Sequence, residues 1–530
     1  MIVDLDETQT LPFDPHVVVL GAGAVGIMLA VALARRGVKV LLCESGGRRV
    51  EPDSQALNDA VVVGRRHAGI AEGRARLLGG TTTLWGGQLI AFQDIDFEPR
   101  PWLGLDGWPI RRADLDRYFV MVAEMLGLPL REGDDEAVWR ALGVTPPDLG
   151  TDVEFVLTRW LRRPNLAQMF AKDLQHNANL AVLLHASAIG FVPADEQVSG
   201  PQRIASVSLR SRKGREIEAD AAHFVVATGT IEASRLMLAA ARKQPALAWS
   251  NNDWIGRAFQ DHLDLRAGDV TALDKKRFGD AFDNIYLHGF KYNPKLVLAN
   301  DTQRSDQITN VAAMFTFESS LTEHLENLKI FLRALRTGAR PPNLRLMPAH
   351  FAALARIWWP LIIRYLKDNR AFNPGDLGIG LRLHCEQRPL AESRISLDPA
   401  RCDGNGVPVT VLDWKVDGRE LEAIAIFSQH IAAALESSGL ARVRIDPRIV
   451  QRDPSLLEAA RDTNHHCGGL QMAADQKRGV VDNELTVFGT QNLSVAGAAV
   501  FPSSSFANPT FTAMALGLRL AERLARKLNG

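Results

Sequence analysis

The pattern of apolar and polar positions is clearest near the N-terminus, where a strand, a helix and a second strand follow one another. Residues 17–20, "VVVL", form a short apolar run between turn residues, which is typical of a buried parallel strand. Apolar residues then recur at helical spacing from 27 to 34 until Gly37 ends the helix, and "VKVLLC" at 38–43 predicts the next strand. The pattern indicates an α/β unit with a parallel sheet.

The turn between the first strand and the helix has the spacing G-x-G-x-x-G. Gly21 permits the tight turn, Gly23 lets the backbone approach a pyrophosphate, and Gly26 lets the helix pack closely on the strand. Glu44, at the end of the second strand, can accept both hydroxyls of an adenosine ribose. We favour dinucleotide binding over a glycine-rich turn in an ordinary α/β unit, but the motif by itself does not separate NAD from FAD.

Later segments predict further elements. "HFVVATGTIEASRLML" at 223–238 predicts a buried strand, a turn at Gly229 and a helix, and "VLLHASAIGF" at 182–191 predicts one strand. "SRISLD" and "PVTVLDW" predict strands of a second sheet.

The segment 320–368 predicts two amphipathic, arginine-rich helices broken at "ARPP", residues 339–342. We favour a helical pair that packs on its domain by the apolar face. A lid or access channel is one alternative, and membrane contact is another, less favoured one.

Composition narrows the classes of protein. The length of 530 residues favours two domains, and 61 basic against 61 acidic residues leave no overall field that would attract nucleic acid. The four cysteines are scattered, which indicates neither a disulfide framework nor a zinc site. The acidic N-terminus lacks the pattern of a signal peptide, and no uninterrupted apolar run is long enough to suggest a membrane span, so we expect a cytoplasmic protein.

Several segments together resemble the glucose-methanol-choline (GMC) family of flavoproteins. They are "RARLLGGTTTLWGG" at 74–87, "GWPI" with "ADLDRYF" at 107–119, the 223–238 segment, "IGRAFQDH" at 255–262, "EQRPLAESRISL" at 386–397, "NHHCGG" at 464–469, and the block from 479 to 525. The resemblance is greatest to the bacterial branch with sugar dehydrogenases and relatives of pyranose oxidase. It implies an α/β Rossmann-type FAD-binding domain interleaved with a substrate domain built on an antiparallel sheet with helices. The expected FAD-binding stretches are 12–98, 178–265 and 462–530, and the expected substrate-binding stretches are 99–177 and 266–461, with the helical insert at about 320–368.

The resemblance also implies which residues contact FAD. Besides the first glycine motif and Glu44, the expected cofactor-binding residues are Gly79, Gly80, Thr81, Thr82, Trp85, Ala188, Gly497, Pro509 and Thr510. A Gly-Gly turn followed by small hydroxyl residues offers backbone N–H groups and short donors to phosphates. Some members attach FAD covalently through a histidine at the position of Leu84. Leucine has no nucleophile, so we predict dissociable FAD.

The resemblance places the catalytic residues near the carboxyl end. The family pattern H-x-x-G-x-x-x-M matches His465 to the base, His466 to its supporting neighbour, and Asn508 to the partner that stabilises a developing alkoxide. Asn508 precedes Pro509 at the start of the last predicted helix, so a helix cap is an alternative role, and the two can coexist. Adjacent residues in an extended chain point to opposite sides, and no spaced third ligand accompanies the two histidines, so we expect no metal site.

The expected function is therefore FAD-dependent oxidation of a CH–OH group in a sugar, glycoside or polyol, by hydride transfer to flavin N5 with a histidine base. The partners would be a small alcohol or carbohydrate and an electron acceptor, O₂ or another carrier. The alternatives are oxidation of a hydrophobic alcohol reached through the insert, and a non-redox FAD-containing lyase. Exact substrate, oxidised carbon, acceptor and oligomeric state are left open by the sequence. Relatives usually carry Thr and Arg where Gly469 and Gln471 stand, so we expect substrate specificity to depend on these two positions.

Overall fold

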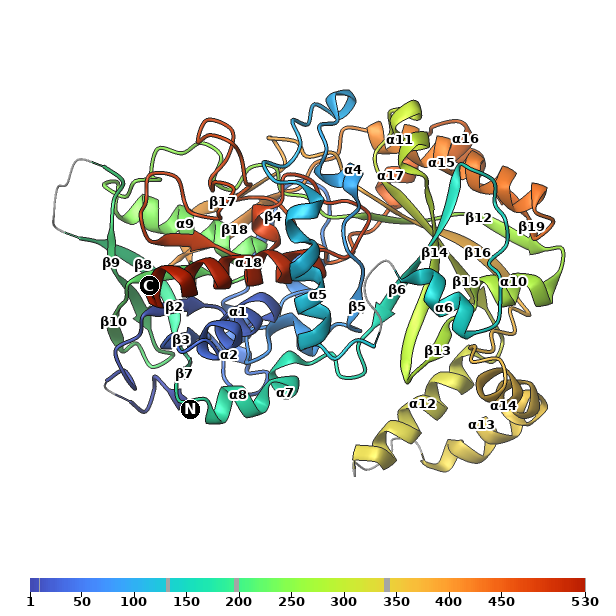
Figure 1. Ribbon diagram of the computed structural model, residues 1–530, viewed down its shortest axis with the longest axis horizontal. Coiled ribbons are helices and arrows are strands. Elements are labelled where there is room, and N and C mark those ends of the chain that lie inside the picture. Colours follow the sequence, from blue (N-terminus) through green and yellow to red (C-terminus); the bar gives the residue numbers. More distant parts are fainter. Residues whose placement is uncertain (9, 130–133, 195–199, 338–343, 530) are drawn as a thin grey trace.

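A six-stranded parallel sheet forms the centre of the part that carries the first glycine motif (Figure 1). The computed structural model describes residues 1–8, 10–129, 134–194, 200–337 and 344–529. The sheet has the order β1 (Ile2–Asp4), β7 (Leu180–Leu184), β3 (Val40–Cys43), β2 (Val17–Leu20), β11 (His223–Val226) and β20 (Leu493–Val495). Strands β2, β3 and β11 are buried along their whole length, which is why their sequences are continuous apolar runs. The strands expected at 17–20 and after Gly37 are thus confirmed.

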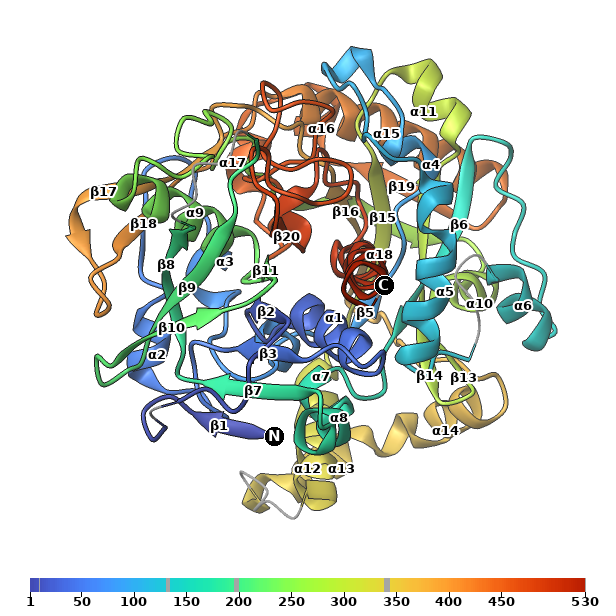
Figure 2. The same ribbon diagram turned by 60° about the vertical axis from the view of Figure 1, so that its left-hand side comes forward.

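Helices and a second small sheet complete this part of the fold. Helix α1 (Ala24–Ala34) packs against α18 (Thr510–Asn529), which in turn contacts α5 (Asp116–Met125). Figure 2 shows α18 nearly end-on, with α1 and α5 beside it. The antiparallel sheet β10 (Glu216–Asp220), β9 (Ile204–Arg210), β8 (Ser187–Pro193) is joined to this part by α9 (Thr230–Lys243), which packs on β8. The strand, turn and helix expected around Gly229 are present as β11 and α9.

The single strand expected at 182–191 is wrong, because the chain turns between β7 and β8. His185 has φ of +50°, in the left-handed region that ends an extended strand. Its Nδ1 lies 2.8 Å from Asp4 and its Nε2 lies 2.7 Å from Glu51. The imidazole therefore holds the turn in place and ties β1 to the parallel sheet.

An antiparallel sheet forms the centre of the other part. Its strands run in the order β19 (Ala441–Ile445), β12 (Leu263–Ala272), β16 (Gly378–Cys385), β15 (Val311–Glu318), β14 (Phe290–Leu298), β6 (Val153–Trp160) and β5 (Gln88–Leu89), with β13 (Ile285–Leu287) paired to β14. Side chains alternate between its two faces. One face is apolar and packs with α15 (Arg419–Ser437) and α10 (Lys275–Phe282). The opposite face includes Val297 and Ala312, which belong to the core of the first part, so this face is turned toward the parallel-sheet body.

The segments "SRISLD" and "PVTVLDW" form strands, but not in the large antiparallel sheet. They lie in β17 (Arg394–Cys402) and β18 (Pro408–Asp413), and β18 pairs in parallel with β4 (Ala60–Val62). The short remaining helices are α2 (Pro52–Ala56), α3 (Gly69–Glu72), α4 (Asp94–Phe97), α6 (Asp135–Ala141), α7 (Leu166–Met169), α8 (Ala171–His176), α11 (Asn300–Asp306), α16 (Pro447–Val450) and α17 (Ser455–Ala459). The domain boundaries drawn from the sequence stay a prediction.

The helical insert projects from the body as α12 (Thr322–Thr337), α13 (Met347–Leu354) and α14 (Trp358–Leu366) (Figure 1). The break expected at 339–342 lies outside the described residues. A further bend of 79° separates the helical stretches 344–354 and 358–366. Within the described chain no single helix is long and apolar enough to cross a membrane, and only this bent pair reaches the required length and composition jointly. The expected packing by the apolar face is wrong, because Trp359 is 71% exposed and Leu366 is 72% exposed.

Candidate active site

A long cavity of about 540 Å³ follows the carboxyl ends of the parallel strands, where open α/β sheets bind their ligands. The predicted cofactor-binding residues that line it are Gly21, Gly23, Glu44, Gly80, Thr81, Thr82, Trp85, Ala188, Gly497, Pro509 and Thr510. The three predicted catalytic residues, His465, His466 and Asn508, line the same cavity. Gly26 and Gly79 do not reach its surface. The fold thus brings segments from both ends of the chain to one cavity.

Close backbone contacts explain the glycines around this cavity. Gly21 has φ of +98°, and a Cβ placed on it would lie 2.6 Å from the carbonyl oxygen of Ala227. A Cβ on Gly26 would lie 1.9 Å from the oxygen of Gly21, and one on Gly80 would lie 2.9 Å from the Cα of Gly23. Gly26 therefore acts through packing, as expected. The loop that contains Gly80 lies directly against the first glycine turn. Any side chain at these positions would force the two loops apart.

Glu44 lies at the end of β3, where the expected ribose acceptor should be. Its carboxylate accepts hydrogen bonds from the backbone N–H of Ala22 at 3.1 Å and of Gly46 at 3.0 Å. Burial raises its pKa above the ordinary value, and these hydrogen bonds act in the opposite direction. A buried carboxylate held at the cavity wall is suited to accept hydroxyl groups.

The threonines after the Gly-Gly turn have different roles. The hydroxyl of Thr82 donates to the carbonyl oxygen of Gly79 and accepts from the backbone N–H of Leu166 at 3.2 Å, so it already has its partners. Thr82 is therefore a loop-holding residue rather than the free donor that the sequence suggested. The indole of Trp85 donates to the carbonyl oxygen of Pro164 at 2.8 Å. Leu84 lines the cavity at the position where some relatives carry the attachment histidine.

His465 and Asn508 meet at the cavity wall although they are far apart in sequence. Asn508 Nδ2 lies 2.7 Å from His465 Nε2. Asn508 Oδ1 is buried and has no hydrogen-bond partner among the described residues, so the amide does not cap α18. The geometry favours the catalytic pair over the helix-cap alternative.

Neighbouring polar groups determine which nitrogen of His465 carries the proton. The hydroxyl of Thr463 donates to the Asp261 carboxylate at 2.9 Å and lies 2.8 Å from His465 Nδ1, so it must accept from that nitrogen. His262 Nε2 faces the carbonyl oxygen of Ser504 at 3.2 Å, which leaves His262 Nδ1 as an acceptor 3.0 Å from His465 Nδ1. His465 therefore carries its proton on Nδ1, and the lone pair of Nε2 accepts the hydrogen bond from Asn508 Nδ2.

Electrostatics keep His465 neutral. Burial, and next the neighbouring ring of His262, lower the pKa of His465 well below its ordinary value. A neutral imidazole with Nε2 directed at the cavity wall can accept a proton from a bound hydroxyl group.

Asp261 organises the loop that carries the catalytic histidine. One carboxylate oxygen, Oδ1, accepts from the backbone N–H of Thr463 at 3.2 Å, of His465 at 3.0 Å and of His262 at 2.7 Å. The other oxygen, Oδ2, lies 3.1 Å from His67 Nε2. Burial opposes ionisation of Asp261, but the His67 hydrogen bond and the surrounding imidazoles outweigh it and hold its pKa far below the usual range.

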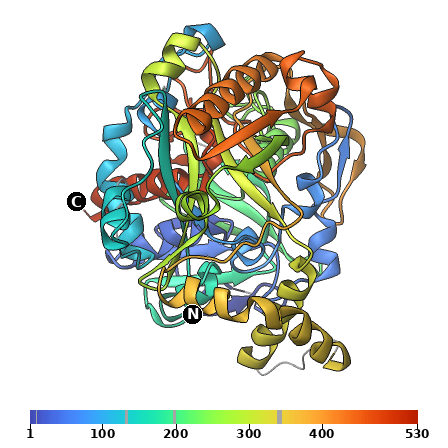
Figure 3. The ribbon, with the colours of Figure 1, turned by 90° about the vertical axis from the view of Figure 1, so that its right-hand side faces the viewer.

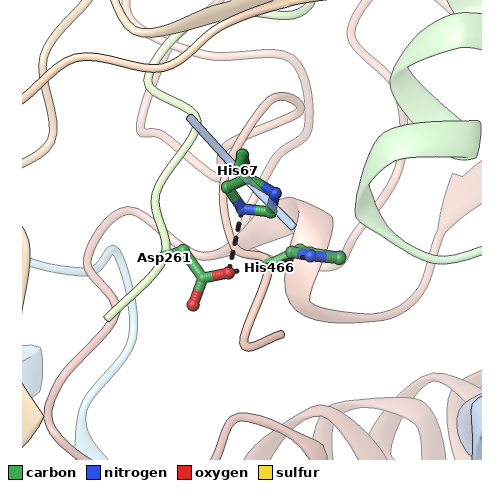
Figure 4. Close-up of side chains that lie close together, drawn as sticks. All are labelled: His67, Asp261 and His466. Atoms are coloured by element: carbon green, nitrogen blue, oxygen red, sulfur yellow. Dashed lines mark hydrogen bonds and ion pairs between the residues drawn. The ribbon is translucent and has the colours of Figure 1, made fainter. Parts of the chain in front are cut away.

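His466 lies next to Asp261 and His67 (Figure 4). The donor atoms of these three side chains are close enough together to hold a metal ion, a cluster that sequence spacing did not suggest. However, His67 Nδ1 accepts from the backbone N–H of Ile70 at 3.0 Å, so its proton is on Nε2, the nitrogen that would have to bind the metal. The hydrogen bonds therefore favour a His67 to Asp261 contact over a metal centre. Burial lowers the pKa of His466 to about 3.

The cavity is equipped for a polar ligand. Four buried polar atoms on residues that line it have no hydrogen-bond partner among the described residues, namely Trp160 Nε1, Thr228 Oγ1, His466 Nε2 and Asn508 Oδ1. Unpaired buried polar atoms are costly unless a ligand satisfies them. Together with the glycine cradle and Glu44, these groups fit a dinucleotide that reaches from the first glycine turn to the start of α18.

Sequence reasoning missed Asp261, His262 and Thr463. The signal was the "QDH" of residues 260–262, which contributed to the family resemblance without an assigned role. Glu386 and Gln387, at the start of the 386–397 segment, are both fully buried and do not line the cavity. Glu386 forms a paired salt bridge with Arg100 at 2.6 and 2.8 Å.

Gly469 and Gln471 do not line the main cavity. A Cβ on Gly469 would lie 2.4 Å from Ser234 Oγ, and Gln471 Nε2 donates to the carbonyl oxygen of Arg478 at 2.6 Å. The expectation that these two positions determine substrate specificity is not supported by their location.

Comparisons with known proteins agree with this geometry. Residues 16–248 match the family model "FAD dependent oxidoreductase", and residues 389–517 match "GMC oxidoreductase". The chain is 28% identical to the C-glycoside 3-oxidase of Microbacterium trichothecenolyticum over 31% of this chain and 30% of that one. It is 23% identical to the 6'''-hydroxyparomomycin C oxidase of Streptomyces lividus over 97% and 91% of the two chains. The solved structure of a fungal aryl-alcohol oxidase shares the fold, with a TM-score of 0.59 at 14% identity over 98% of this chain and 100% of that chain.

The parallel sheet, the glycine cradle and the family match over residues 16–248 define an FAD-dependent oxidoreductase. The match at the carboxyl end and the full-length relative specify it further. Residues 389–517 carry the carboxyl-terminal domain of the GMC oxidoreductase family, which confirms the resemblance found in the sequence.

Proposed function

We propose that this protein oxidises a CH–OH group of a sugar or glycoside to a carbonyl, with His465 as the base. The observation that carries the proposal is the unprotonated Nε2 of His465, which accepts a 2.7 Å hydrogen bond from the Asn508 amide in the cavity wall. The two relatives are named C-glycoside 3-oxidase and 6'''-hydroxyparomomycin C oxidase, and these names support a carbohydrate substrate.

Each residue of the pair has a defined role. A bound substrate hydroxyl replaces the direct hydrogen bond between the two side chains, so that its oxygen accepts from Asn508 Nδ2 and its proton passes to His465 Nε2. The Asn508 amide then stabilises the negative charge that develops on that oxygen. Bound FAD supplies the acceptor for the hydrogen that leaves the carbinol carbon. Thr463 and His262 hold the imidazole in the tautomer that this proton transfer requires.

Polar residues on one face of the antiparallel sheet are further evidence for a hydroxyl-rich substrate. This face, turned toward the FAD-binding part, carries His384 beside Asp264, and Lys295 two strands away. His384 Nδ1 and Lys295 Nζ are buried without a hydrogen-bond partner among the described residues, and burial lowers the pKa of Lys295 to about 8. Lys295 Nζ is a donor, and His384 Nδ1 is an acceptor because the ring donates from Nε2 to Asp264. Polar groups of this kind suit sugar hydroxyls better than an apolar chain.

We expect FAD to be released when the protein is precipitated with acid, because Leu84 offers no nucleophile for a covalent link at the position used by some relatives. The measurement is the flavin absorbance of the supernatant and the pellet after centrifugation. Yellow colour that stays with the denatured protein would overturn this expectation.

Anaerobic mixing of the holoenzyme with monosaccharides, glycosides and lipophilic alcohols tests the proposed substrate class. We expect bleaching of the flavin by members of the carbohydrate set, and recovery of the colour with air or an artificial acceptor identifies the route of reoxidation. Bleaching by lipophilic alcohols alone would favour the hydrophobic-alcohol alternative. Turnover of an alcohol without bleaching would indicate a lyase.

A further inference from the structure

The helical insert concentrates the exposed apolar side chains of the protein. Of the nineteen large apolar residues that are exposed in the described chain, ten lie between residues 330 and 366. They are Ile330, Leu332, Leu335, Leu344, Leu346, Trp358, Trp359, Ile363, Tyr365 and Leu366. Exposed apolar surface gathered in one short segment marks a binding surface, whereas scattered single residues do not.

Helix α14 shows how this surface is directed outward. Trp359, Ile363 and Leu366 follow one another at helical spacing and are 71%, 38% and 72% exposed. Arg364 is held by the body instead, where it pairs with Asp280 and, at 3.0 Å, with Asp283. The salt bridges therefore fix α14 by its polar side and leave its apolar residues exposed. Figure 3 shows the insert helices projecting from the body.

The other helical stretches of the insert also carry exposed apolar side chains. Leu332 and Leu335 of α12 lie one turn apart and are 54% and 57% exposed. Leu344 and Leu346, just before α13, are also at least half exposed. We call the set Leu332, Leu335, Trp359, Ile363 and Leu366 the insert face.

The insert is strongly basic in a chain that is neutral overall. Residues 322–367 contain eight Lys or Arg and two Asp or Glu, while the whole chain has 61 of each sign. Lys329, Arg345 and Lys367 are exposed on the insert. Exposed tryptophan and tyrosine, apolar rows and surrounding basic residues are the combination that binds the interfacial region of an anionic bilayer.

We propose that the insert face docks on an anionic lipid bilayer and holds the enzyme at a membrane surface. The charge argues against a second copy of the chain as the occupant, because two insert faces would bring like charges together. The 79° bend argues for helices that lie in the interfacial layer over helices that cross it. This proposal does not depend on the proposed substrate.

Sedimentation with lipid vesicles tests the proposal on the full-length holoenzyme. We expect the protein to sediment with vesicles of phosphatidylcholine and phosphatidylglycerol, less with phosphatidylcholine alone, and less again as the salt concentration rises. The variant Trp359→Glu/Leu366→Glu should lower the vesicle affinity by at least about tenfold, because two buried apolar contacts are lost. Val63→Glu/Val450→Glu is the matched control, since both valines are exposed outside the insert, and it should bind like the unaltered protein.

The charge variant Lys329→Glu/Arg345→Glu/Lys367→Glu provides a second measurement that keeps the apolar surface intact. We expect it to lose the preference for anionic vesicles. Failure of the unaltered protein to sediment with anionic vesicles would overturn the proposal, as would an equal loss in the valine control. A dimer in ultracentrifugation that Trp359→Glu/Leu366→Glu dissociates, without vesicle binding, would overturn it in favour of a second copy.

Discussion

Replacing His465 by alanine is expected to lower kcat by about 10²–10⁴-fold, because the substrate hydroxyl loses the group that accepts its proton. FAD content should be unchanged, since the cofactor is expected to be held by the glycine loops and Glu44 rather than by the imidazole. Steady-state rates with the best substrate of the panel, normalised to bound flavin, give the measurement. Asn508→Ala should lose about 10²–10³-fold through the missing hydrogen-bond donor.

The pH profile separates a base from a structural role for His465. The base works only when it is neutral, and burial with the neighbouring His262 lowers its pKa well below 6.5. Activity should therefore stay level through neutral pH and fall only as the pH drops through this lowered pKa. A decline that begins above pH 6.5, or an identical profile in His465→Ala, would contradict the assignment.

Asp261→Asn is expected to destabilise the holoenzyme and to lower kcat together. An amide can replace only one of the two carboxylate oxygens as an acceptor, so its NH₂ group must face either His67 Nε2 or the N–H groups of the catalytic loop. Each buried donor left without a partner costs about 1–3 kcal/mol. Urea unfolding followed by flavin and tryptophan fluorescence measures the loss of stability.

Asp462→Asn is the matched control for this prediction. The Asp462 carboxylate accepts from the backbone N–H of Ala68 at 2.8 Å and of Gly69 at 2.7 Å in the same region, but no described hydrogen bond joins it to His465. We expect Asp462→Asn to lose stability and to keep most of kcat. If both variants keep kcat, Asp261 does not position the catalytic loop.

Local sequence rules predicted the nucleotide end of the fold well. The run "VVVL", the three glycines and Glu44 obey short-range steric and periodicity requirements, and each was found in the expected element. The strand break at His185 could not be predicted this way. It depends on Asp4 and Glu51, which are remote in sequence and come together only in the folded sheet.

The catalytic pair, His465 and Asn508, was predicted through family resemblance. The residues that hold the His465 ring in place were not predicted. Thr463 and His262 act through the tautomer of His465, and their role becomes visible only once the hydrogen-bond directions are known. The predicted packing of the insert was wrong for a different reason. Amphipathic spacing predicts that a helix has an apolar side, but it does not say whether the body of the protein covers that side.

Anaerobic single-turnover reduction of the bound flavin, compared between the unaltered enzyme, His465→Ala and His466→Ala, tests the central claim most directly. We expect rapid bleaching by the carbohydrate substrate in the unaltered enzyme, bleaching that persists in His466→Ala, and near loss of bleaching in His465→Ala. Bleaching that survives intact in His465→Ala and disappears in His466→Ala would contradict the account and assign the base to the other histidine.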